Sequence, residues 1–400
     1  MQLSQYNPLA VEVLRVARAD VAHDSPATVD FAYATALREA RQVDVHVTEA
    51  FDGAPGLDVG LADPPWTPVN TGTTEAAFGS VRAADGSLII FADNGKEIRS
   101  TDNGKTWNQV TLGNSDDILA AVLANDGSII MSTNGFIFRS TDNGQTSTGV
   151  TTVSGISSAV VVADDGSISL AFRDGTGVRS TDNGLTWTSI SLDGATFMKT
   201  AVRAADGSLI LAGDFGDTAR STDNGQTWNK INSGTSEQFR ASVLAADGSL
   251  ILATAGAENV LRSVDNGQTW TVVSTGLGGF LTNLAVALRN PDDDLIVAGR
   301  NGTAVRSTDN GQTWSQINIG TTEWMRTGVL ANDGSILLAG DSGTAVRKFP
   351  AVTLASLSAA ELASPGLHSL PVRGSATPSI EFASGGATQG AAKVELTYRT

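Results

Sequence analysis

The chain has 400 residues, of which 17% are charged and 41% hydrophobic, and its formal net charge is −16. This composition excludes a disordered tail, and the acidic balance argues against binding to nucleic-acid phosphates or to an anionic membrane surface, because both require clustered lysine and arginine. The chain has no cysteine, which excludes disulfides, thiolate metal sites and a cysteine nucleophile.

Residues 1–65 show strand patterns but no repeat. Segments such as TVDFAYAT and VDVHVTEAF have the composition and alternation of strands. The opening residues, MQLSQYNPLAVEV, lack a basic start followed by an apolar run, so we predict no signal peptide, and no stretch is apolar enough to span a bilayer. The segment offers too few strands for a covered sandwich by itself, and a partner segment is therefore expected.

An eight-residue sequence of the form SxDxGxTW recurs beyond residue 66. Its copies begin at serines spaced 40 to 44 residues apart, namely Ser100, Ser140, Ser180, Ser221, Ser263 and Ser307. Each repeat also contains a short turn between apolar runs, as in RAADGSLII, where Asp-Gly predicts a hairpin. Seven such turns occur, the sixth written NPDDD at 290–294. A period near 40 residues fits a four-stranded propeller blade, so we predict seven blades.

A strand of similar sequence follows each copy of the eight-residue motif, and one further strand of this kind has no motif before it. This further strand is WTPVNTG, beginning at Trp66, whereas the seventh repeat ends near Phe349 without a copy of its own. The two incomplete units complement each other. We therefore predict that the Trp66 strand completes the last blade and closes the ring, which removes exposed sheet edges.

The recurring aspartates and tryptophans are predicted to be structural. Hydroxyl and carboxylate groups can bond the backbone of a tight turn, glycine accepts its positive φ, and the tryptophan starts the next strand and packs between blades. Ser147 replaces one tryptophan, which a repeated scaffold tolerates. The residues with this role are Asp102, Asp142, Asp182, Asp223, Asp265, Asp309, Trp107, Trp187, Trp228, Trp270 and Trp314.

These copies resemble the Asp-box, or BNR, repeat of β-propeller proteins over about residues 66 to 349. That resemblance implies a β-propeller in which the box is a turn remote from the active face. Its members include sialidases, sortilin-type receptors, photosystem assembly factors and glycan-active enzymes, so it indicates a fold rather than a function.

The loops opposite the boxes diverge in sequence and are the expected place for a ligand. Counting back seven residues from the hairpin aspartates gives Phe78, Leu119, Ser158, Lys199, Arg240 and Arg326, and two places earlier stand Phe197 and Trp324. Aromatic and basic side chains at one rim could stack on a sugar and pair with its acid group. Packing between blades is the alternative for half of them. The ligand-binding candidates are Phe197, Lys199, Arg240, Trp324 and Arg326.

Sialidase chemistry is not expected. It requires a tyrosine nucleophile and an arginine triad, but Tyr6, Tyr33 and Tyr398 fall outside the ring, and the evenly spaced arginines, one per blade, are interpreted as blade structure. The histidines also fall outside it, so we expect no metal and no cofactor. An alternative is a glycoside hydrolase or lyase using Glu75 and Glu323, although Glu237 at the same repeat position favours simple repetition.

Residues 350–400 again show strand patterns, as in PSIEFAS and AAKVELTYR. Together with residues 1–65 they would supply about seven to nine strands, enough for a sandwich or jelly roll. We therefore predict an all-β protein in which the propeller, residues 66–349, is inserted into a β-sandwich split between 1–65 and 350–400. Insertion is tolerated where the host's chain ends meet.

The end segments carry a second resemblance. VTEAFDGAPGLDVGLAD at 47–63 and IEFASGGATQGAAKVELTYR at 380–399 are similar to the β-sandwich modules of tailed-bacteriophage virion proteins. The resemblance implies a sandwich that assembles on the particle, often as a trimer, with an inserted domain facing outward. This chain departs from the usual form in carrying a whole propeller after Asp63.

The leading hypothesis is a virion structural protein, such as a capsid decoration, fibre or adhesion protein, that is not an enzyme. Its expected partners are other virion proteins, further copies of itself and a host surface glycan, without nucleic acid or membrane insertion. Assembly in the host bacterial cytoplasm is the expected setting. The alternatives are the glycan-processing enzyme and an assembly factor of the photosystem type, which would require export.

Overall fold

The computed structural model describes residues 66–110, 116–256, 258–277 and 283–349 and, outside this stretch, eight strands. Its internal contacts divide the chain into two units, Pro65–Lys348 and the pair of segments Met1–Pro64 and Phe349–Thr400. The unit Pro65–Lys348 is a seven-bladed β-propeller of antiparallel sheets, which confirms the predicted all-β class and blade number.

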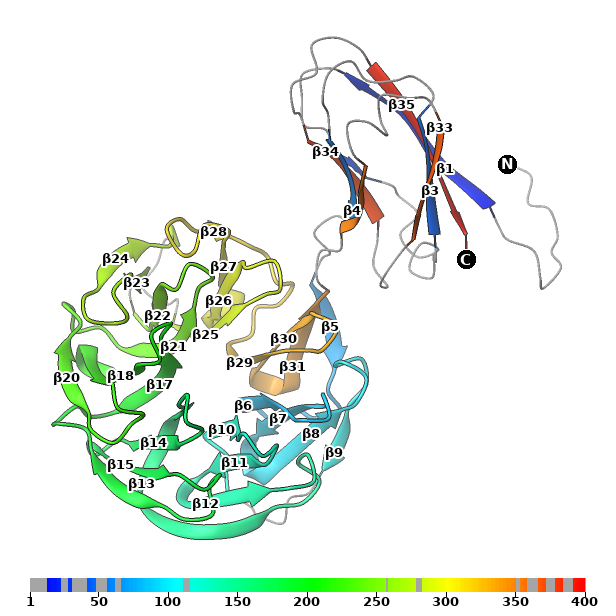
Figure 1. Ribbon diagram of the computed structural model, residues 1–400. Coiled ribbons are helices and arrows are strands. Elements are labelled where there is room, and N and C mark those ends of the chain that lie inside the picture. Colours follow the sequence, from blue (N-terminus) through cyan, green and yellow to red (C-terminus); the bar gives the residue numbers. More distant parts are fainter. Residues whose placement is uncertain are drawn as a thin grey trace. The chain divides into compact units, whose positions relative to one another are not determined.

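Each blade has four strands ordered from the axis outward, and the blades surround one centre (Figure 1). One strand, β13, is long enough to serve both as the outer strand of blade 2 and as the inner strand of blade 3. In chain order the strands of blades 1 to 3 are β6 (Ala77–Arg82), β7 (Leu88–Ala92), β8 (Lys96–Ser100), β9 (Asn108–Val110), β10 (Ala120–Leu123), β11 (Ile129–Ser132), β12 (Asn134–Ser140), β13 (Thr148–Val162), β14 (Ile168–Phe172), β15 (Thr176–Ser180) and β16 (Thr188–Ser191).

Blades 4 to 7 repeat this plan. In blades 1, 4, 6 and 7 a short 3-10 turn links the second strand of the blade to the third. The turns are η1 (Asp93–Gly95), η2 (Asp214–Gly216), η3 (Arg300–Gly302) and η4 (Asp341–Gly343). The strands of blades 4 to 7 are β17 (Met198–Arg203), β18 (Leu209–Gly213), β19 (Asp217–Ser221), β20 (Asn229–Asn232), β21 (Phe239–Leu244), β22 (Leu250–Thr254), β23 (Asn259–Ser263), β24 (Thr271–Ser274), β25 (Leu284–Arg289), β26 (Leu295–Gly299), β27 (Ala304–Ser307), β28 (Ser315–Gln316), β29 (Met325–Leu330), β30 (Ile336–Gly340), β31 (Thr344–Lys348) and β5 (Thr67–Asn70).

The ring closes through a strand from its N-terminal side. β5 pairs antiparallel with β31, with Thr67 opposite Arg347 and Asn70 opposite Thr344. Trp66, which precedes β5, is buried against the apolar cluster of blades 6 and 7 that contains Ile319. Closure therefore joins residues about 280 positions apart, and no blade of the ring is left with three strands.

The core lies between neighbouring blades. The second strand of most blades is buried along its whole length, as the LIIFA and LILAG segments of β7 and β18 illustrate. A strand covered on both faces must be apolar throughout, which explains why these segments lack the alternation of a half-buried strand. Trp228 is 4% exposed and packs with apolar residues of blades 3 and 4.

The Asp box is a turn saturated with hydrogen bonds. In the first copy the Asp102 carboxylate accepts from the backbone N–H of Lys105 at 3.0 Å and of Thr106 at 2.9 Å, and the Thr106 hydroxyl donates to it at 2.6 Å. Ser100 donates to the same carboxylate and accepts from Gly104 N–H. Burial alone would raise the pKa of Asp102, but the bonds from Thr106 and Ser100 outweigh it and lower the pKa to about 2.

The asparagine of the box has a positive φ, which the sequence pattern predicted for the glycine only. Asn103 has φ 60° and Gly104 has φ 82°, so two successive residues take the left-handed conformation. Asparagine is the side chain that tolerates this region best after glycine. The need for two successive left-handed residues thus explains why Asn-Gly occupies the middle of the box.

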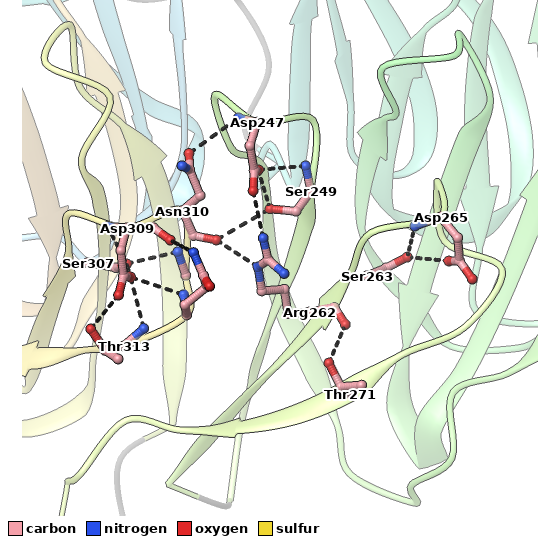
Figure 2. Close-up of polar contacts among 12 residues, drawn as sticks. Asp247, Ser249, Arg262, Ser263, Asp265, Thr271, Ser307, Asp309, Asn310 and Thr313 are labelled. Carbon is pink, nitrogen blue, oxygen red and sulfur yellow. Dashed lines mark hydrogen bonds and ion pairs between the residues drawn. The ribbon is translucent and has the colours of Figure 1, made fainter.

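The arginine before five of the six boxes bridges two blades, as Figure 2 shows for Arg262. Its Nη2 donates to Asp247 in its own blade at 2.6 Å, and its Nε donates to the carbonyl of Asn310 in the box of the next blade at 2.8 Å. Arg99, Arg139, Arg179 and Arg220 make the same pair of contacts. Arg306, before the sixth box, instead donates from its Nε to Asp294 in its own blade. These arginines belong to the scaffold and do not converge on a substrate.

In the second unit the structure describes eight strands, contributed by both ends of the chain. They form two four-stranded antiparallel sheets in which N-terminal and C-terminal strands pair, ordered β1-β35-β3-β33 and β2-β34-β4-β32. Their bounds are β1 (Val13–Ala22), β2 (Thr28–Asp30), β3 (Gln42–Val47), β4 (Gly56–Leu61), β32 (Thr353–Leu357), β33 (Gly366–Pro371), β34 (Pro378–Ala383) and β35 (Ala391–Arg399). The side chains that would pack a sandwich, and the AFDG and GGATQG segments, lie outside the described residues.

Candidate functional site

A pocket of about 350 Å³ lies where the innermost strands of the propeller meet. Six of these seven strands, β6, β10, β17, β21, β25 and β29, are labelled around the centre in Figure 1, and the seventh is the second half of β13. Five of them, β6, β17, β21, β25 and β29, each contribute their second residue to the pocket. The residues that line the pocket are Phe78, Leu119, Arg173, Lys199, Arg240, Ala285, Trp324 and Arg326.

The structure brings four of the five predicted ligand-binding residues together in this pocket: Lys199, Arg240, Trp324 and Arg326. Phe197 does not line it. Arg173 was missed by counting along the repeat, because it follows the second strand of its blade instead of lying on the first. A signal was present, however: Asp93, Asp214 and Asp341 occupy the corresponding position in three other blades, so an arginine there reverses the charge.

Arg326 is held in place by its neighbours. Its Nε donates to the Asp341 carboxylate, and its Cζ lies 3.9 Å from the centroid of the Trp324 ring and 5.3 Å from that of Phe78. Arg300 also lies over Trp324, at 5.6 Å. Cation–π contacts therefore occupy the aromatic surface that the sequence suggested for a sugar. Trp324 positions Arg326 in this structure.

Arg173, Lys199 and Arg240 have no carboxylate within ion-pair distance in the described part of the chain. The Nε atoms of both arginines are buried without a hydrogen-bond partner. Burial lowers the pKa of Lys199. The positive charges of Arg173 and Arg240 lower this pKa further, whereas the Asp214 carboxylate raises it. Three like charges meet here with one acid nearby.

The charge imbalance has a local origin in the repeat. In blade 7 the residue after the second strand is Asp341, which pairs with Arg326. The corresponding residue in blade 5 is Ala255, so Arg240 lacks that partner, and in blade 3 it is Arg173 itself. Among blades 3 to 5, Asp214 in blade 4 is the one acid at this position, and its Oδ1 is buried without a partner. Blades 3 to 5 thus form the cationic side of the pocket.

Phe197 stands beside the pocket and pairs with Phe215. The two rings meet edge to face with centroids 5.8 Å apart, and they are 39% and 65% exposed. Both residues have positive φ, 53° and 61°. The Phe197 N–H donates to the Arg173 carbonyl at 2.9 Å, which attaches this aromatic pair to the cationic side.

Glu75 and Glu323 do not line the pocket. Glu75 pairs with Lys96 at 2.7 Å, and this lysine together with Asn94 lowers the pKa of its carboxyl, opposite to what a general acid needs. Both residues, like Glu237, use the backbone carbonyl to accept from a glycine N–H in the second-to-third-strand turn of a neighbouring blade. The recurrence of glutamate therefore accompanies a structural contact.

Glu97 on β8 is a buried acid away from the pocket. It is 0% exposed, and neither carboxylate oxygen has a hydrogen-bond partner among the described residues. Burial raises the pKa of Glu97 to about 8. Its register partners are Phe91 on β7 and Val110 on β9, so it occupies a position suited to an apolar side chain.

In the part of the chain that the structure describes, no group of three or more His, Cys, Asp or Glu side chains is arranged to hold a metal ion. Among the same residues, no helix has the length and apolarity needed to cross a membrane.

Comparison with known proteins identifies a family for the propeller. The family described as photosynthesis system II assembly factor YCF48 matches residues 63–344. No curated protein matches the chain in sequence.

Solved structures share the fold at low sequence identity. The complex described as YCF48 bound to D1 peptide is 18% identical with a TM-score of 0.61, covering 74% of this chain and 98% of that one. Virginiamycin B lyase from Staphylococcus aureus, a catalytically inactive form with quinupristin, is 15% identical with a TM-score of 0.62, covering 71% and 99%. An extracellular domain of a putative one component system from B. thetaiotaomicron is 12% identical with a TM-score of 0.57, covering 70% of this chain and 39% of that one. At these identities the likeness shows the fold alone.

Proposed function

The chain belongs to the family of the photosynthesis system II assembly factor YCF48, and from this premise we propose that its propeller is a binding head whose axial pocket takes an anionic group of a partner. The head is not an enzyme in this proposal. It is carried by a bacteriophage virion protein, a capsid decoration, fibre or adhesion protein, and it faces the host surface.

The observation that carries the proposal is the set of cations without acid partners in the pocket. A chain of net charge −16 has ample carboxylates for its arginines, and its scaffold arginines use them. Arg173 and Arg240 remain unpaired in the described residues, which is costly for half-buried charges unless a ligand neutralises them. An anionic ligand is the complement of this site.

The virion part of the proposal rests on the chain ends. Their resemblance to phage sandwich modules agrees with strands from both ends pairing in the same two sheets. In the proposal these sheets form a split sandwich or jelly roll that docks on other virion proteins and on further copies of the chain, with a trimer as the expected assembly. The protein then assembles in the host bacterial cytoplasm.

An acidic host glycan is the proposed ligand, recognised chiefly by charge because Arg326 already stacks on Trp324. Binding of uronic-acid oligosaccharides to the full chain, measured by calorimetry, tests this. We expect affinity for the acidic oligosaccharide and none for its carboxyl-reduced form. Lys199→Met should weaken binding, whereas Lys105→Met, which removes an exposed charge on an Asp box, should not. Equal binding of the two oligosaccharides would contradict the proposal.

A protein segment with acidic residues is a second candidate, favoured by the family member that binds a D1 peptide. The same titration with an acidic peptide distinguishes the two. Tighter binding of the peptide than of the oligosaccharide, lost in Lys199→Met, would assign the pocket to a protein partner.

Immunogold electron microscopy of particles from the culture that produces the protein tests the virion part. Label on the head indicates decoration, and label at the tail tip indicates host recognition. Particles without label, with the protein left in the soluble fraction, would overturn the virion assignment while leaving the anion site to be judged by the titrations.

A further inference from the structure

The cationic side of the pocket has a definite charge. Arg173, Lys199 and Arg240 contribute three positive charges, and Asp214 is the one acid that acts on Lys199. Arg326 is already paired with Asp341 and does not enter this balance. Two positive charges are left uncompensated, and a carboxylate ligand would neutralise one of them.

The donors come from three successive blades. Arg173 follows β14, Lys199 lies on β17 and Arg240 lies on β21, so they approach a bound group from different directions. Guanidinium and ammonium groups arranged in this way suit a tetrahedral oxyanion, which presents several acceptor oxygens, better than a planar carboxylate.

Outside the pocket lining, the aromatic pair of Phe197 and Phe215 adjoins these cations through the Phe197 N–H bond to the Arg173 carbonyl, and the Phe215 backbone is strained. Phe215 is the middle residue of η2, and the same place in η1, η3 and η4 is taken by Asn94, Asn301 and Ser342, all with positive φ. Asparagine tolerates this conformation, whereas a bulky aromatic does not, and strain of this kind marks functional sites. Phe215 is moreover 65% exposed, so it gains little from burial in the protein itself.

Resting on the proposed anion-binding function, we infer that the pocket recognises a phosphate monoester dianion, such as a phosphorylated sugar, held by Arg173, Lys199 and Arg240, with its organic part against Phe197 and Phe215. The Phe197 N–H bond to Arg173 and the sequence neighbours Asp214 and Phe215 join the two halves of this site.

The test compares three probes on the full chain by calorimetry at pH 7.5: phenyl phosphate, inorganic phosphate and benzoate. We expect phenyl phosphate to bind most tightly and benzoate at least about tenfold more weakly, because charge-assisted bonds to the second charge are lost. Lowering the pH to 5 should weaken phenyl phosphate, whose second pKa is about 6, while benzoate is little affected.

Two variants separate the halves of the site. Lys199→Met should reduce the affinity for both phosphates by about tenfold or more. Phe215→Asn, which installs the residue found in η1 and η3, should fold normally and weaken phenyl phosphate but not inorganic phosphate. Lys105→Met is the matched control and should leave all three affinities unchanged.

The outcomes distinguish this inference from the function on which it rests. If benzoate binds as tightly as phenyl phosphate and Lys199→Met weakens both, the pocket binds anions but does not select a dianion, and the inference is wrong. If Phe215→Asn leaves phenyl phosphate binding unchanged, the aromatic contact is wrong. If neither these probes nor acidic oligosaccharides or peptides bind, both the inference and the proposed function fail.

Discussion

The arginines of the blade interfaces and the cations of the axial pocket belong to the same ring but have opposite surroundings. Arg262 donates to a carboxylate in its own blade and to a carbonyl in the next. Arg240 has one amide contact, to Gln238, and a buried Nε without a partner. The blade-interface arginines, which donate to carboxylates and carbonyls, stabilise the scaffold. The pocket cations keep free donors, which are available to a ligand from outside the chain.

Glu97 shows that lack of partners alone does not make a binding site. Its carboxyl is as unpaired as the pocket cations, but it is 0% exposed and lies outside the pocket. The difference is access. Substitutions are therefore expected to act differently on the buried Glu97, on the hydrogen-bonded scaffold groups and on the accessible pocket cations. They differ in whether stability rises or falls and in whether anion binding changes.

The largest effect is expected for Glu97→Val, which copies Val260 at the corresponding position of blade 5. The pKa of Glu97 is about 8 in the folded chain against a usual 4.5, so its destabilisation is absent below pH 4.5, grows as pH rises from 4.5 to 8 and is complete beyond that. A shift of this size corresponds to about 5 kcal/mol at most. Urea unfolding at pH 5 and pH 9 should show a loss in the natural chain that the variant lacks. Equal stability of the natural chain at the two pH values would contradict the assignment.

A smaller loss is expected when one saturated box is broken. Asp309→Ala removes the acceptor for Gln312 N–H, Thr313 N–H and two hydroxyls, and it should reduce the free energy of unfolding by about 2 to 4 kcal/mol. Binding of phenyl phosphate in the pocket should not change. A loss of anion affinity with intact stability would show that the box is part of the site.

The direct comparison is between Arg262→Met and Arg240→Met. The first should cost about 1 to 2 kcal/mol of stability, because Asp247 loses its ion pair and the Asn310 carbonyl loses one of its hydrogen bonds, and should leave anion binding intact. The second should keep or increase stability, since it removes a repelled charge, and should abolish anion binding. Chemical unfolding and calorimetry on the same two variants would refute the comparison if the effects were reversed.

The smallest effect per residue is expected in acid. Hydrogen bonds, chiefly from Thr186, lower the pKa of Asp182 to about 2, so its contribution is present at pH values above the usual 3.8 and is lost as pH falls toward 2. Asp182→Asn should flatten the stability profile over that interval, measured by thermal unfolding between pH 2 and pH 5. An unchanged slope would contradict the role of the carboxylate.

The repeat architecture can be predicted from the amino-acid sequence alone. Hairpin turns and boxes at regular spacing indicate seven blades, because turn chemistry and strand periodicity are local properties. Counting along the repeat also placed Lys199, Arg240 and Arg326 at equivalent positions, and the structure has all three in one pocket. The split sandwich remains a prediction.

Which of these charged groups have partners depends on the tertiary structure. Arg326 and Asp341 are 15 residues apart, and Arg262 contacts a box 48 residues further on, so pairing depends on how strands and blades are placed in space. The same is true of Arg173 in the pocket, of Trp324 beneath a guanidinium and of the buried carboxyl of Glu97. Charge compensation and burial are set by distances between strands, which a repeat pattern does not encode.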